Sequence, residues 1–100
     1  MSKVKHVAFL KFKDGTPEEE IDKVFDEILD LTENVDGIED YVAGPNNSPE
    51  GLNKGFTHAF IVTFQDGAAR DAYLAHTEHE RVKTLLLAHI DDVAVVDFEI

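Results

Sequence analysis

The five histidines are the residues of this sequence best suited to chemistry. The chain contains no cysteine, which excludes thiol nucleophiles and thiolate metal sites. His6 and His58 interrupt apolar rows in which every second residue lies on the same side of a strand. In the stretch 73–79 (YLAHTEH), Tyr73 precedes His76 by one helical turn, so the two side chains should share a helix face. His79 closes this stretch. The candidate site therefore consists of His6, His58, Tyr73, His76 and His79.

These residue types favour acid–base chemistry on a small molecule. His79 falls in the first turn of a predicted helix, where the positive end of the helix dipole disfavours the imidazolium and keeps the ring neutral. A neutral imidazole near neutral pH is what a general base requires. Tyr73 could then orient a substrate carbonyl or phenol as a hydrogen-bond donor.

Two other interpretations of the histidines stay open. Each one could be a core or interface residue with a satisfied hydrogen bond. Alternatively, several could bind a metal ion, since neutral imidazole is a common ligand. The spacing of His76 and His79 disfavours a metal site, because a predicted helix cap separates them and no acidic residue is placed to complete the site. Nucleotide binding is unsupported, since no glycine-rich phosphate loop is present.

The elements that must position these side chains are short and alternate in type. Apolar alternation predicts strands over 4–12, 38–43, 56–64 and 93–100. The first helix is predicted from Thr16 as N-cap to Asn34, with Pro17 in its first turn and Glu19 completing a capping box. Apolar residues at helical spacing with acidic residues between them make this helix amphipathic.

A second helical region follows the third strand. It begins at Asp66 and is interrupted around His76, after which Thr77 as N-cap and Glu80 repeat the capping-box pattern and start another helix. The order β-α-β-β-α(α)-β predicts an α+β protein with a ferredoxin-like split βαβ arrangement, in which helices cover one face of an antiparallel sheet. Phenylalanines lie on both sides of the strands. The open face should therefore be buried too, most simply against the sheet of a second chain.

Length and charge limit the classes of partner. The 100 residues suffice for one domain, 1–100, and 9 basic against 21 acidic residues give a net charge of −12. That charge works against binding to nucleic acid or to an anionic membrane surface. No apolar run approaches the ~18 to 20 residues of a spanning helix, and no signal peptide is evident. A cytoplasmic location is therefore expected.

Motifs along the whole chain resemble the stress-responsive A/B barrel (Dabb) family. They are residues 4–7 (VKHV) with 10–14 (LKFKD), 55–58 (GFTH) running into 63–64 (TF), 73–79 (YLAHTEH) and 95–98 (VVDF). The joint order of these motifs is more specific than any single one. The resemblance implies a ferredoxin-like homodimer in which two sheets pack into a barrel.

The resemblance also implies roles for the candidate residues. One plant member of the family is a polyketide cyclase that closes a linear polyketide by an intramolecular aldol step without a cofactor. Residues matched to it would make His79 the base that removes a proton next to a carbonyl, while Tyr73 holds the substrate. His6, His58 and His76 would line the pocket. This chain has Ile28 where the cyclase has a pocket tyrosine, and Thr77 where a proline is usual.

The expected ligand is therefore a small, largely apolar polyketide-like molecule or aromatic carboxylic acid. The alternative that the resemblance supports is a non-enzymatic stress-response protein whose dimer stability is its function. Heme degradation on a similar barrel, with a histidine as axial ligand, is a third possibility. Some members of the family bind magnesium near the end of the first helix, which corresponds here to backbone carbonyls over 32–38.

Overall fold

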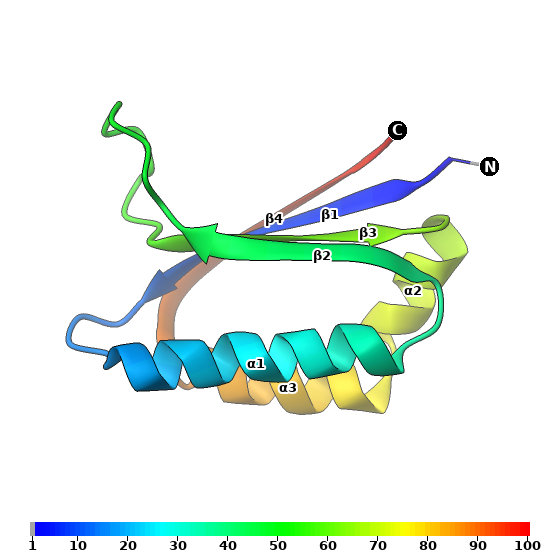
Figure 1. The fold of residues 1–100 in the computed structure, drawn as a ribbon, viewed down its shortest axis with the longest axis horizontal. Coiled ribbons are helices and arrows are strands. Elements are labelled where there is room, and N and C mark those ends of the chain that lie inside the picture. Colours follow the sequence, from blue (N-terminus) through cyan, green and yellow to red (C-terminus); the bar gives the residue numbers. More distant parts are fainter. Residues whose placement is uncertain (1) are drawn as a thin grey trace.

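The fold is a four-stranded antiparallel sheet with three helices on one of its faces (Figure 1). The structure is a computed structural model and describes residues 2–100. Its elements are β1 (Val4–Phe12), α1 (Glu18–Asn34), β2 (Ile38–Pro45), β3 (His58–Phe64), α2 (Gly67–Leu74), α3 (Thr77–Leu87) and β4 (Ile90–Glu99). The strands lie in the order β2-β3-β1-β4. The predicted α+β, ferredoxin-like arrangement is confirmed.

The central strand β1 divides its side chains between the two faces of the sheet. Val4, His6, Ala8, Leu10 and Phe12 are buried on the helix-covered side, while the residues between them lie on the other side. β1 pairs antiparallel with β3 and with β4. His6 thereby lies among core residues on the face that the helices cover.

Helix α1 packs on the sheet through residues at helical spacing. Ile21, Val24, Ile28 and Leu31 are all buried. The helix ends at Asn34, as predicted.

The predicted N-cap of α1 is wrong by one residue. Pro17 occupies the cap with an extended backbone, and its carbonyl accepts from the N–H groups of Glu20 and Ile21. The Thr16 hydroxyl donates instead to the carbonyl of Lys13, at 2.6 Å. The hydroxyl therefore closes the turn after β1, and no capping box with Glu19 forms.

The end of α1 turns sharply into β2 at Gly37. This residue has a φ of +88°, and a Cβ placed on it would lie 2.6 Å from the Cβ of Ala69. Both the backbone conformation and the close approach of α2 therefore require glycine. Its carbonyl accepts from the N–H of Gln65, which ties this turn to the end of β3.

The break between α2 and α3 falls where the sequence predicts it. Asp66 caps α2 by accepting from the N–H of Ala69 at 2.8 Å. The cap of α3 is His76 rather than the predicted Thr77, because Nδ1 of His76 accepts from the N–H of Glu78 at 3.0 Å. His79 still lies in the first turn of α3.

Strand boundaries also differ from prediction by a few residues. β2 continues to Pro45, and β4 begins at Ile90 because it pairs with Phe12 across a bulge in the β1–β4 register. β3 begins at His58, since the N–H of Phe56 donates to the carbonyl of Asn53 and closes the preceding loop.

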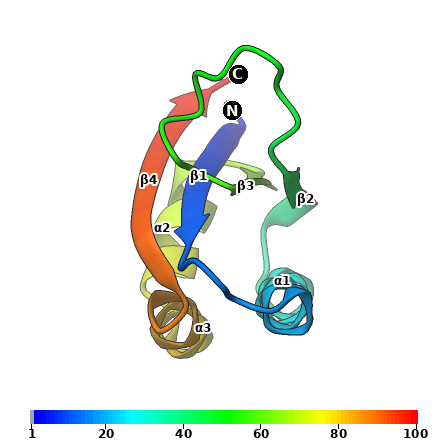
Figure 2. The same cartoon turned by 90° about the vertical axis from the view of Figure 1, so that its left-hand side faces the viewer.

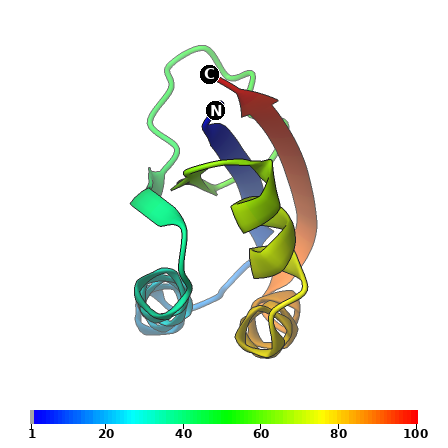
Figure 3. The same cartoon turned by 90° about the vertical axis from the view of Figure 1, so that its right-hand side faces the viewer.

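The sheet face opposite the helices is uncovered in the single chain (Figures 2 and 3). The loop between β2 and β3 rises on that side, away from the helices. Large apolar side chains are exposed on this outer face, among them Phe9, Val42, Val96 and Phe98. The described chain thus buries one face of its sheet and leaves an apolar second face open.

Candidate functional site

A cavity of about 330 Å³ lies between the helix-covered side of β1 and β4 and the three helices. This volume falls at the lower end of the range typical of small-molecule sites. Most of its walls are apolar, and its polar lining residues are His6, Tyr73, His79, Lys83 and Asp97. These residues come from β1, α2, α3 and β4, so the site depends on the whole fold.

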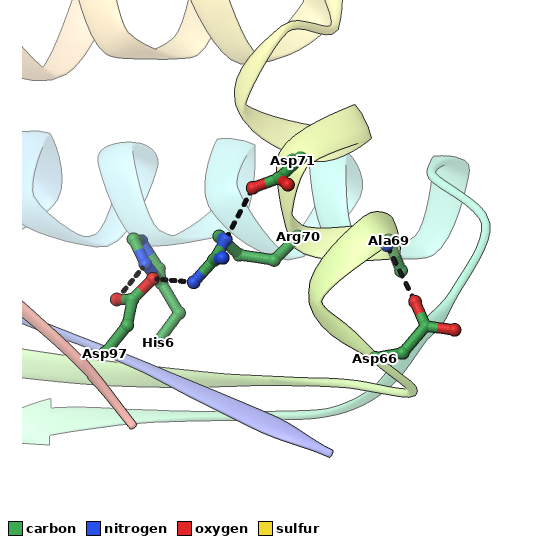
Figure 4. A network of polar contacts seen from close by, with 6 residues as sticks. All are labelled: His6, Asp66, Ala69, Arg70, Asp71 and Asp97. Atoms are coloured by element: carbon green, nitrogen blue, oxygen red, sulfur yellow. Dashed lines mark hydrogen bonds and ion pairs between the residues drawn. The ribbon is translucent and has the colours of Figure 1, made fainter. Parts of the chain in front are cut away.

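His6 is held at the cavity wall by a chain of polar contacts (Figure 4). Its Nδ1 donates to Oδ1 of Asp97 at 2.8 Å, because a carboxylate can only accept. The other carboxylate oxygen accepts from Nη1 of Arg70 at 3.0 Å, and Nε of Arg70 donates to Asp71 at 2.8 Å. With Nδ1 protonated, Nε2 is the acceptor nitrogen of the neutral ring.

The β1–β4 register explains this contact. His6 pairs with Asp97 across the two strands, so both side chains project from the same face of the sheet. Arg70 reaches Asp97 from α2 and compensates its negative charge.

Tyr73 is buried and lines the cavity. Its ring meets the rings of Phe64 and His79 edge to face, with centroids 5.1 and 4.8 Å apart, and lies 6.1 Å from the ring of His6. Burial raises the pKa of Tyr73 to about 12. The phenol therefore stays protonated at physiological pH and serves as a hydrogen-bond donor.

His79 combines a neutral ring with an unpartnered nitrogen. Burial lowers its pKa, Glu80 opposes that change, and the positive charge of Lys83 adds to it. The direction agrees with the sequence prediction, although the main cause is burial rather than the helix dipole. Its Nδ1 is enclosed and makes no hydrogen bond of good geometry within 2–100, although the backbone carbonyl of Leu74 is close enough to the ring to oppose the lowering of its pKa. Leaving such a group unpaired costs about 1–3 kcal/mol.

Two of the predicted pocket residues lie elsewhere. His58 packs between the rings of Phe12 and Phe25, with centroids 5.0 and 5.6 Å away, and its Nδ1 bonds to Oγ1 of Thr57 at 2.9 Å. It borders two other depressions, of about 420 and 340 Å³. His76 caps α3 and does not line the main cavity. The structure therefore brings together His6, Ile28, Tyr73 and His79.

Sequence patterns do not single out Asp97, Arg70 or Lys83. Alternation in the stretch 95–98 could have shown that Asp97 and Phe98 face opposite ways. The register that places Asp97 beside His6 is a tertiary feature, and no local pattern encodes it.

Residues 2–100 contain no cluster of metal-binding side chains and no helix that could span a membrane. Within that part of the chain, no three His, Cys, Asp or Glu side chains stand close enough together to hold a metal ion. None of its helices combines the length and apolar character needed to cross a bilayer. The segment 32–38 forms the end of α1 and the turn into β2, and magnesium binding by its backbone carbonyls stays a prediction.

Comparison with known proteins gives consistent matches over nearly the whole chain. The protein family described as Stress responsive A/B Barrel Domain matches residues 4–100 of this chain. The stress-response A/B barrel domain-containing protein HS1 of Arabidopsis thaliana is 33% identical over 96 residues, covering 96% of this chain and 88% of that protein. Olivetolic acid cyclase of Cannabis sativa is 29% identical over 76 residues, covering 76% of this chain and 75% of the cyclase.

A solved structure extends the likeness to the assembly of a relative. The crystal structure of a dimeric ferredoxin-like protein from Jannaschia sp. CCS1 matches with a TM-score of 0.87 and 27% identity. The match covers 98% of this chain and 99% of the Jannaschia chain. This chain is therefore similar throughout to a protein that is dimeric.

Proposed function

Because the chain belongs to the family of stress-responsive A/B barrel domains, we propose that its cavity binds a small, largely apolar ligand and acts on it by cofactor-free acid–base chemistry. The ligand class is a polyketide-like molecule or an aromatic carboxylic acid. Support comes from the apolar walls, the two neighbouring groups Tyr73 and His79, and the similarity to olivetolic acid cyclase.

The observation that carries this proposal is the unpartnered nitrogen of His79. Three other histidines have partners within the protein: His6 bonds to Asp97, His58 to Thr57, and His76 to the backbone of α3. A purely structural histidine would be satisfied in the same way. His79 instead leaves its enclosed Nδ1 without a hydrogen bond of good geometry in the described chain, and its ring lines a cavity of ligand size.

The proposed chemistry is an intramolecular aldol closure. The neutral ring of His79 removes a proton from a carbon next to one ligand carbonyl, and that carbon attacks a second carbonyl of the same molecule. Tyr73 donates a hydrogen bond to the oxygen on which negative charge develops. The imidazolium then returns its proton to this oxygen. Ile28 keeps the adjoining wall apolar, which suits an alkyl or aromatic group.

We also propose that a second copy of the chain covers the outer face of the sheet. The exposed apolar residues Phe9, Val96 and Phe98 lie on that face, and their burial would be favourable. The dimeric Jannaschia protein has the same fold over almost its full length. The strand residues that line the cavity lie on the helix-covered face, so a partner on the outer face would pack on the opposite side of the sheet.

The test is a side-chain NMR titration with an alkyl-resorcylic acid. Signals of His79, Tyr73 and Leu10 should shift, whereas those of His76 should not, because His76 does not line the cavity. His79→Gln should weaken binding about three- to tenfold, through loss of one hydrogen-bonding ring. His89→Gln is the matched control, because His89 lies outside the cavity lining. Light scattering on the same samples should give the mass of two chains.

Two results would contradict these proposals. Unchanged cavity signals at saturating ligand would favour the second candidate, a non-enzymatic stress-response protein. The mass of a single chain would contradict the covered outer face.

A further inference from the structure

Lys83 is a charged residue of the cavity lining that the proposed chemistry does not use. It lies on α3, four residues after His79, and it lines the cavity while remaining exposed. It forms no ion pair with any residue in 2–100, whereas Arg70 pairs with Asp97 and Arg81 pairs with Glu27. Lys83 is therefore a cation of the cavity lining that no carboxylate of the described residues holds in an ion pair.

The cavity wall changes from polar to apolar along the strands. The β1–β4 register places the pair His6 and Asp97 at one end and the pair Leu10 and Val93 at the other. The two pairs are four residue steps apart along the strands, a distance of about 13 Å. α3 follows the same gradient from His79 to Leu87.

Lys83 lies between these two ends. Residues four apart share a helix face, so Lys83 stands one turn beyond His79, about 6 Å along the axis. Its charge is one of the causes that lower the pKa of His79, which agrees with this closeness. The carboxylate of Asp97 also lines the cavity, but Arg70 already compensates it.

We propose that Lys83 recognises an acidic group of the ligand, so that the ligand is an amphipathic organic anion. Its carboxylate would lie at Lys83, its reactive carbonyl near Tyr73 and His79, and its alkyl or aryl part toward Leu10. This inference rests on the proposed function and specifies its ligand class. The net charge of −12 repels anions in general, so a preference for an anion requires a local cation such as this one.

The test compares two probes of nearly equal size and shape, the anionic 4-hexylbenzoate and the neutral 4-hexylbenzamide. The wild type should bind the benzoate about two- to fivefold more tightly than the benzamide, the range expected for an exposed ion pair. The preference should shrink in high salt, because mobile ions screen exposed charges. Calorimetry supplies the affinities, and NMR shifts of Ala8 and Leu10 verify that the probe occupies the cavity.

Two variants locate the source of the preference. Lys83→Met retains a linear apolar side chain and removes the charge, so both probes should bind equally well. Lys23→Met removes one charge from the exposed side of α1, away from the cavity lining, and should keep the preference. This control separates a local contact from a change in net charge.

The outcomes distinguish the two proposals. If both probes bind in the cavity with equal affinity, or if Lys83→Met keeps the preference, the role of Lys83 is wrong while the cavity remains a binding site. If neither probe binds, the proposed function fails together with this inference.

Discussion

His79, on helix α3, and His58, on strand β3, occupy similar surroundings. Both are partly buried, and both contact aromatic rings, Tyr73 in one case and Phe12 with Phe25 in the other. Burial is the main cause that lowers the pKa of each ring. By these criteria either histidine could belong to a site.

Their hydrogen bonds separate them. Nδ1 of His58 bonds to the Thr57 hydroxyl, while Nδ1 of His79 has no partner within residues 2–100. His79 also faces a cavity shared with Tyr73 and His6, whereas aromatic rings flank His58. The lowered pKa is therefore shared by His58, which is packed in the core, and by His79, which belongs to the candidate site, and it does not distinguish them. What distinguishes the site is an unsatisfied polar atom beside other polar groups.

The largest expected effect concerns packing. Phe12 is buried against His58, and Phe12→Ala should lower the free energy of unfolding by about 3–5 kcal/mol. Leu86→Ala at the cavity should cost only about 1 kcal/mol, because Leu86 is half-buried and faces existing free volume. Urea unfolding at one fixed protein concentration measures both, which keeps any association constant.

Equal losses of unfolding free energy in Phe12→Ala and Leu86→Ala would contradict the expected difference between the two regions. They would mean that the wall around His79 is packed as tightly as the region around His58, leaving little room for a ligand.

The second effect concerns the buried contact of His6. Asp97→Ala should lower the free energy of unfolding by about 1–3 kcal/mol, because it leaves the buried Nδ1–H of His6 unpaired. Asp97→Asn keeps an acceptor oxygen and should lose less. Asp71→Ala, at the exposed end of the same chain of contacts, should leave the unfolding midpoint unchanged.

The tautomer of His6 gives an independent readout. Nitrogen shifts of the ring should report the proton on Nδ1 in the wild type and a mixture of tautomers in Asp97→Ala. A ring that keeps its tautomer in that variant would show that Asp97 does not orient His6.

The fold could be predicted well from the sequence because its signals are local. Alternation over 4–12 and helical spacing over 18–34 each determine which residues face the core. The errors fall at strand ends and at the helix caps, where Thr16 and Thr77 each have a neighbour that takes the cap position. Pro17 has the extended backbone of a cap, and the imidazole of His76 accepts a backbone N–H as a threonine hydroxyl would.

The site could be predicted only in part, because alternation indicates a face of the sheet but not a position along it. His6 and His58 share the helix-covered face, as their patterns indicate. His58, however, pairs with Leu10 from the β3 side, and its ring packs against Phe12 and Phe25 instead of lining the cavity. Asp97 could not be placed, since the β1–β4 register depends on long-range pairing.

The smallest expected effect is on titration and compares the two histidines directly. Both His79 and His58 should titrate below the ordinary histidine pKa of 6.5. Between the lowered pKa and 6.5 the unfolded chain binds more protons than the folded one, so stability should fall as pH falls through that window and then level off. His79→Gln and His58→Gln should each remove part of this slope.

A bound anion should then affect one histidine and not the other. Glu80, Lys83 and His6 already contribute charge at His79, whereas Glu18 acts on His58. A benzoate placed at Lys83 would add negative charge near His79 and raise its pKa toward 6.5, because an anion favours the imidazolium. His58 should titrate as before, since it does not line this cavity. Equal shifts at both rings, followed by NMR, would mean that the anion acts on the protein at large and that the two regions do not differ in function.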